Sequence, residues 1–108
     1  MGAPKEFTAA NFDAMTKKGN VVVDFWASWC GPCKIVSPIL EQVAAVLHDK
    51  VAFGKVNVDN EYELAERFEI MAVPSLLFFK DGELIDRITG ALSKDELVKR
   101  AKEAFSLN

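Results

Sequence analysis

The run from Val21 to Ala27 limits the possible folds of this chain most strongly, because it is apolar on both alternating faces except at Asp24. It is rich in β-branched and aromatic residues, a pattern typical of a strand in a sheet that is covered on both faces. From Pro32 onward the apolar residues recur at helical spacing, and the spacing continues past Pro38. We therefore expect a central strand followed at once by a helix that is kinked at Pro38.

The rest of the chain alternates between helix and strand patterns in the same way. Phe7 and Thr8 resemble a hydrophobic staple and N-cap for a helix that ends near Gly19. Further strands are expected at 51–58, 75–79 and 84–89, with helices at 62–68 and after the capping box at 93–96. This order predicts an α/β fold with a central mixed β-sheet flanked by helices on both faces. Residues 1–6 leave an extra edge strand open.

Length and composition favour a single domain over residues 1–108. Half of the 108 residues are hydrophobic, which is enough for a core without covalent support. The net charge is −3, and no basic and aromatic cluster suggests a nucleic-acid partner. No apolar run has the length of a membrane span or of a signal-peptide core, so we expect a cytoplasmic protein with no membrane contact.

The two cysteines, Cys30 and Cys33, lie at the expected turn between strand and helix. In a reducing cytosol a disulfide that closes so short a loop adds little stability. A closed zinc site needs about four ligands, whereas the chain offers these two cysteines and His48, so a metal site would have to be shared between two copies. The sequence therefore favours a redox couple.

The helix start assigns different roles to the two thiols. Unpaired backbone N–H groups and the helix dipole favour a thiolate at Cys30. Cys33, one turn further in, is expected to be more enclosed and to resolve the mixed disulfide that Cys30 forms. Gly31 and Pro32 keep the turn narrow and open to another polypeptide.

Resolution releases a proton from Cys33, and Asp24 is the first candidate to accept it. Its place within an apolar strand predicts burial, which raises the pKa of a carboxyl group toward neutrality. The alternative is an aspartate that is bonded to backbone and has no part in the chemistry. Lys55, in the next strand, would supply a positive charge that moderates the effect of burial on Asp24. Its spacing fits a solvent-facing lysine equally well.

The sequence resembles the thioredoxin family over nearly its whole length. The resemblance rests on VDFWASWCGPCK at 23–34, Pro38, Val-Asn-Val-Asp at 56–59, Val-Pro-Ser-Leu at 73–76, Phe-Lys-Asp-Gly at 79–82, and Gly-Ala at 90–91. It implies a thioredoxin fold and a general protein-disulfide reductase that works as a monomer, needs no cofactor beyond its cysteine pair, and is regenerated by thioredoxin reductase.

The resemblance also assigns roles to individual residues. Cys30 would attack, Cys33 would resolve, Asp24 would accept the proton, and Lys55 would be its neighbour. Pro74 would follow a cis peptide bond and face the disulfide. The apolar contact surface for protein substrates would consist of Trp29, Ala72, Val73, Pro74, Gly90 and Ala91.

Two rivals share this fold. A scaffold subunit with idle cysteines needs neither the cysteine pair nor Asp24 and Pro74, so the presence of all four favours catalysis. An oxidase or isomerase of the same fold usually has His or Tyr between the cysteines. This chain has Gly31 and Pro32 there, which favours a reductant.

Overall fold

A computed structural model describes residues 3–107 of the chain. The elements in chain order are β1 (Lys5–Glu6), α1 (Phe12–Thr16), β2 (Asn20–Trp26), α2 (Gly31–Leu47), β3 (Ala52–Asn57), α3 (Tyr62–Arg67), β4 (Ser75–Lys80), β5 (Glu83–Thr89) and α4 (Lys94–Phe105). Every element expected from the sequence is present in the expected order. One further strand, β1, precedes them.

The strands form one mixed sheet with β2 at its centre. The order across the sheet is β1-β3-β2-β4-β5, in which β1, β3 and β2 run parallel while β4 and β5 pair antiparallel. The two residues of β1 pair with Gly54 and Lys55 of β3. A Cβ atom at Gly54 would overlap the ring of Phe7, so this glycine leaves room for the segment after β1 to close over the sheet.

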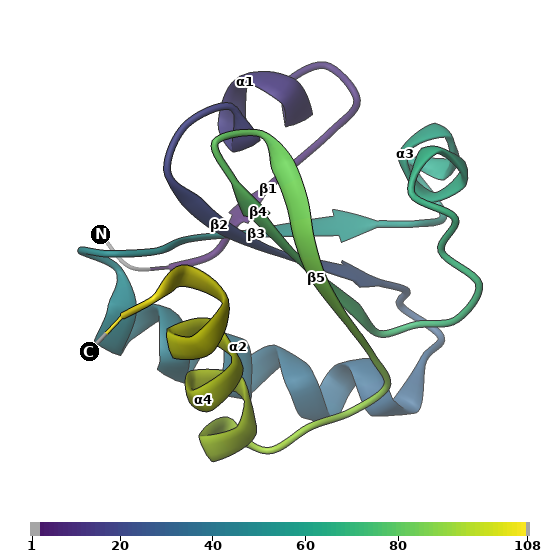
Figure 1. The fold of residues 1–108 in the computed structure, drawn as a ribbon. Coiled ribbons are helices and arrows are strands. Elements are labelled where there is room, and N and C mark those ends of the chain that lie inside the picture. The colour runs from purple at the N-terminus through teal and green to yellow at the C-terminus, as the bar shows by residue number, and fades with distance from the viewer. Residues whose placement is uncertain (1–2, 108) are drawn as a thin grey trace.

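Helices cover both faces of the sheet, as predicted. In Figure 1, α2 and α4 lie on one side of the strands and α1 and α3 on the other. Alternate residues of β2 serve the two sides: Val22 packs with α2 and α4, whereas Val23 and Phe25 pack with α1 and α3. By the same alternation Asp24 faces α2. None of the helices within residues 3–107 is long and apolar enough to cross a membrane.

The start of α1 differs from the expectation. Thr8 is not its N-cap: the helix begins at Phe12 after Asn11, and the carbonyl of Thr8 instead accepts hydrogen bonds from the N–H groups of both residues in a preceding turn. The helix also ends at Thr16, earlier than predicted, before Gly19 adopts a φ of +76°. Phe7 and Phe12 do pack edge to face, with ring centroids 6.1 Å apart. The predicted contact between Phe7 and Phe12 is therefore present. The predicted N-cap at Thr8 is wrong, because a turn separates Thr8 from the start of α1.

The long helix α2 begins where the cysteine motif predicts. Cys30 is its N-cap and Pro32 lies in its first turn. The helix continues past Pro38 to Leu47, as the periodicity predicts. The kink at Pro38 stays a prediction.

Candidate active site

The two cysteines are joined by a disulfide at the N-terminus of α2. The sulfur of Cys30 also accepts a hydrogen bond from the backbone N–H of Cys33, with 3.1 Å between nitrogen and sulfur. In the reduced protein this N–H and the positive end of the helix dipole stabilise a thiolate at Cys30 more than a neutral thiol. The local fold therefore favours Cys30 as the ionised member of the pair.

Burial does not separate the two cysteines in the way that the sequence predicts. Cys30 is 4% exposed and Cys33 is 3% exposed, so the expected greater enclosure of Cys33 is not found. Their neighbours differ instead. Cys33 lines a pocket that contains Asp24, whereas the sulfur of Cys30 lies 3.6 Å from the carbonyl oxygen of Val73.

The loop before β4 lies directly against Cys30. The peptide bond between Val73 and Pro74 is cis, and the N–H of Gly90 donates to the carbonyl of Pro74 at 2.8 Å. This bond ties the end of β5, and with it Ala91, to the same loop. The structure thus places Val73 against Cys30 and links Gly90 to Pro74 within the same loop.

The remaining implied contact residues are at the surface. Trp29, which precedes Cys30, is 70% exposed. Ala72 is exposed, and its carbonyl accepts a hydrogen bond of 2.7 Å from the hydroxyl of Ser75. Gly31 and Pro32 are exposed on the turn itself. Another polypeptide can therefore reach the rim of the disulfide.

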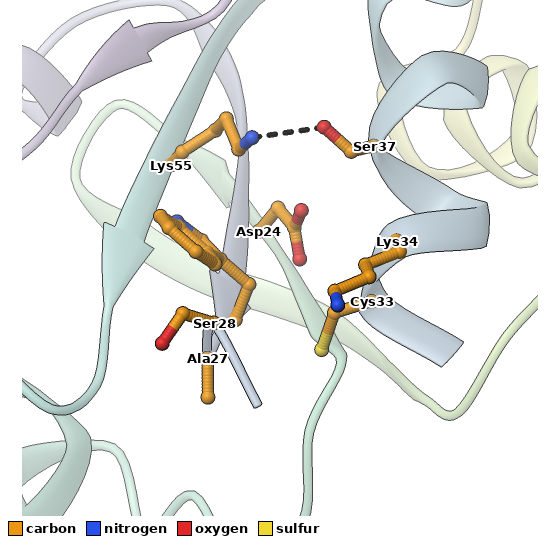
Figure 2. Close-up of a pocket in the computed structure, with 8 residues that line it drawn as sticks. Asp24, Ala27, Ser28, Cys33, Lys34, Ser37 and Lys55 are labelled. Carbon is orange, nitrogen blue, oxygen red and sulfur yellow. Dashed lines mark hydrogen bonds between the residues drawn. The ribbon is translucent and has the colours of Figure 1, made fainter. Parts of the chain in front are cut away.

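A pocket of about 240 Å³ lies between β2, β3 and the first turns of α2 (Figure 2). Its lining combines one carboxyl group, two amino groups, two hydroxyls and one of the cysteine sulfurs. The residues are Asp24, Trp26, Ala27, Ser28, Cys33, Lys34, Ser37 and Lys55. Cys33 and the predicted proton acceptor, Asp24, thus line the same pocket.

Asp24 is fully buried in the middle of β2. Neither of its carboxylate oxygens accepts a hydrogen bond from any residue within 3–107, so it is not the backbone-bonded aspartate of the alternative interpretation. Burial raises the pKa of Asp24 from 3.8 to about 7, against the opposing effect of the Lys55 charge. A carboxyl group with this pKa can accept and release a proton near neutral pH.

Lys55 faces the pocket and not open solvent. It stands opposite Asp24 in the register of β2 and β3, and it is half-buried. Its ammonium donates a hydrogen bond of 3.0 Å to the hydroxyl of Ser37 and lies 4.9 Å from the centre of the Trp26 ring. Within the described part of the chain, Lys55 forms no ion pair with Asp24.

Sequence reasoning did not single out Ser37, and it placed Trp26 in the buried strand without assigning it to the pocket. Ser37 follows Cys33 by four residues, so the two share one face of α2. This spacing could have indicated that Ser37 lies near the active site. Trp26 has the same strand parity as Asp24 and therefore faces α2 as well. Both residues contact Lys55, whose direction the sequence did not settle.

Within residues 3–107, no group of three or more His, Cys, Asp and Glu residues is placed to hold a metal ion. His48 is exposed at the C-terminal end of α2. The site therefore offers a disulfide that can open to two thiols, and beside it a carboxyl group that titrates near neutrality. Such a set is suited to exchange of disulfides coupled to movement of a proton.

Comparisons with known proteins agree with this chemistry. The family model described as Thioredoxin matches residues 3–103. A thioredoxin of Staphylococcus aureus is 41% identical over 92 residues, which cover 85% of this chain and 88% of the relative. The crystal structure of Malassezia sympodialis thioredoxin (Mala s 13) has a TM-score of 0.86 and 35% identity, and the match covers 96% of this chain and 92% of that one.

A second solved structure is similar to the same degree. It comes from work on the thiol-resolving mechanism of yeast mitochondrial 1-Cys peroxiredoxin via glutathione/thioredoxin systems. The TM-score is 0.85 at 34% identity, with 93% of this chain and 94% of that chain covered. With a matching family model, close relatives and a redox-active cysteine pair at the start of α2, the chain belongs to the thioredoxin family of thiol–disulfide oxidoreductases.

Proposed function

We propose that the protein is a general protein-disulfide reductase in which Cys30 attacks and Cys33 resolves. The Cys30 thiolate bonds to one sulfur of a substrate disulfide, and the other substrate sulfur leaves as a thiolate. Cys33 then loses its proton and attacks the Cys30 sulfur. This second step releases the first substrate sulfur as a thiolate and leaves the Cys30–Cys33 disulfide, so two electrons pass to the substrate.

The observation that carries this assignment is the position of Cys30 as N-cap of α2. Its sulfur accepts a hydrogen bond from the N–H of Cys33 and lies 3.6 Å from the carbonyl oxygen of Val73. An N–H donor stabilises negative charge on the sulfur and so favours attack from this cysteine. Cys33 instead lines the pocket of Asp24, where a proton can be handed over.

In this mechanism Asp24 accepts the proton of Cys33, and the positive charge of Lys55 limits the rise in the pKa of Asp24. The support is the full burial of Asp24, its pKa of about 7, and its place in the same pocket as Cys33. A base is most effective when its pKa lies near the working pH. A carboxylate in water, with a pKa near 4, would be a much weaker base for a thiol.

The substrate is proposed to be an extended polypeptide that contacts the rim around Cys30. Trp29, Ala72, Val73, Pro74, Gly90 and Ala91 would form that rim. The support is the exposure of Trp29 and the bond that ties Gly90 to Pro74. Backbone pairing with the loop at Val73 would give affinity with little dependence on substrate sequence, which suits a general reductase.

We further propose that thioredoxin reductase restores the dithiol and that the cysteine pair carries the electrons with no added cofactor. A reducing pair of this kind has its use in a reducing compartment, which supports a cytoplasmic location. We also expect one domain and a monomer, because the proposed steps require only one cysteine pair and one pocket.

Turnover of a disulfide-bonded test protein tests the proposal. The wild type, Cys30→Ser and Cys33→Ser are compared with a small dithiol as reductant, and covalent adducts are identified by mass. We expect turnover by the wild type alone and a mixed disulfide on Cys33→Ser. If no variant differs from the wild type or forms an adduct, the cysteines are idle and the protein is a scaffold of the same fold.

A further inference from the structure

The ammonium group of Lys55 is held by two neighbours, and neither is Asp24. It donates to the Ser37 hydroxyl at 3.0 Å and lies over the Trp26 ring at 4.9 Å from the centroid. Figure 2 shows the Lys55 side chain extended toward Ser37 on α2, with the Asp24 carboxylate lying below this bond. An ion pair with the adjacent carboxylate would be the ordinary expectation for two opposite charges in register.

We propose that Ser37 is a positioning residue whose hydroxyl holds the Lys55 ammonium against α2 and keeps it from pairing with the Asp24 carboxylate. This inference rests on the proposed function of Asp24 as proton acceptor. It adds a residue that acts through Lys55 and touches no substrate. Ser37 is half-buried in the same pocket, so the contact is shielded from bulk water.

The position of Lys55 matters because few other charges face Asp24. From β3 the only facing charge among the described pocket residues is Lys55, and from α2 the facing groups are Cys33 and Lys34. The neighbouring position on β4 is the buried and apolar Leu76. A direct ion pair with Lys55 would stabilise the carboxylate and lower the pKa of Asp24 below neutrality. Asp24 would then be a weaker base at the pH where Cys33 must lose its proton.

The choice of serine at this position has no advantage for the helix. Ser37 lies inside α2, where alanine is the better helix former. A Ser37→Ala variant should therefore fold at least as well as the wild type. Any change in the behaviour of Asp24 can then be attributed to the lost hydroxyl and not to a damaged helix.

The test is an NMR titration of the Asp24 side-chain carboxyl carbon in the reduced protein. In Ser37→Ala we expect the pKa of Asp24 to fall by about 1, which is a tenfold change in proton affinity, because Lys55 is freed to pair with the carboxylate. Ser37→Thr keeps a hydroxyl and should retain the wild-type value. Ser28→Ala removes another hydroxyl from the same pocket and serves as the matched control.

A second variant shows whether the effect runs through Lys55. In a Lys55→Met background, Ser37→Ala should leave the pKa of Asp24 unchanged. The inference is overturned if Ser37→Ala has no effect in the wild-type background, in which case Trp26 alone holds the ammonium. It is also overturned if the fall persists when Lys55 is absent.

The rate of mixed-disulfide resolution separates this inference from the proposed function. If the midpoint of the pH–rate profile falls together with the pKa of Asp24, both are supported. If the pKa falls while the midpoint stays, Ser37 does position Lys55, but Asp24 is not the proton acceptor for Cys33.

Discussion

The two faces of the sheet have different contents, although the central strand β2 supplies both. On the side of α1 and α3, Phe12 packs against the rings of Phe7, Phe25, Phe68 and Phe79. On the side of α2, Asp24 takes an equally buried position with no hydrogen-bond partner among residues 3–107. Both faces bury apolar clusters, but the second face also places an ionisable group where water would ordinarily be preferred.

The chemistry therefore lies on one face of β2, whereas apolar packing stabilises both faces. Val23 and Phe25 belong to the aromatic side, and Asp24 between them faces the cysteine pocket. A buried carboxyl group without a partner lowers the stability of the folded state whenever it is charged. Apolar packing on both faces offsets this cost. Truncation of a buried ring and neutralisation of Asp24 should therefore change stability in opposite directions.

The largest effect is expected on the aromatic face. Phe12→Ala should lower the free energy of unfolding by about 4 kcal/mol, because it removes a ring that is 1% exposed and leaves a cavity among four others. Urea unfolding measures the loss. Tyr62→Ala, at a residue that is 72% exposed, is the control and should change stability far less. Similar small losses in both variants would show that the buried ring of Phe12 contributes little to stability.

Asp24→Asn should have the opposite effect and raise stability above neutral pH. The pKa of Asp24 is about 7 in the folded protein and 3.8 in the unfolded reference. The stability tied to this raised pKa is therefore fully present below about pH 4 and is lost as pH rises through 7, in total about 4 kcal/mol. A buried amide retains part of the desolvation cost, so the net gain at about pH 8 should be about 2 kcal/mol.

Unfolding measured between about pH 4 and pH 8 checks this prediction. The variant should lose much less stability than the wild type over that interval. Asp49→Asn, at an exposed position after α2, controls for the change in net charge. Equal pH dependence in the wild type and Asp24→Asn would show that Asp24 does not titrate near neutrality.

A smaller effect is expected for Lys55→Met. Loss of the opposing charge should raise the pKa of Asp24 further above 7 and lower stability at about pH 8 by about 1 kcal/mol. At about pH 4 Asp24 is protonated in the folded state, so this electrostatic loss should disappear. The same two-point unfolding experiment measures the difference. A loss that is equal at both pH values would mean that Lys55 acts through packing alone.

Much of the fold could be predicted because its elements carry strong local patterns. The apolar run of β2, the periodicity of α2 and the capping box at Ser93 each correspond to an observed element. β1 could not be predicted with the same evidence, because two residues give no alternation to detect and the strand depends on pairing with β3. The turn before α1 could not be predicted either, because Thr8 and Asn11 are both residue types that favour the N-cap position of a helix.

The site was predictable where it lies in one stretch of sequence and less so where it depends on side-chain direction. Cys30, Cys33 and Asp24 follow from one strand and one turn. The contact of Lys55 with Ser37 joins residues from β3 and α2, and no spacing rule fixes which way a long lysine side chain turns. The similar burial of the two cysteines could not be predicted from their spacing either, because it depends on packing against distant residues such as Val73.

The pH dependence of mixed-disulfide resolution tests most directly whether Asp24 accepts the proton of Cys33. Reduced protein is mixed rapidly with a disulfide-bonded peptide, and release of the second peptide thiol is followed in the wild type and Asp24→Asn. In the wild type the rate should rise with a midpoint near pH 7, matching the pKa of Asp24. In Asp24→Asn the rate near neutrality should fall by a factor of about 100, and that midpoint should vanish. The same rate and midpoint in both proteins would show that Asp24 does not accept the proton of Cys33.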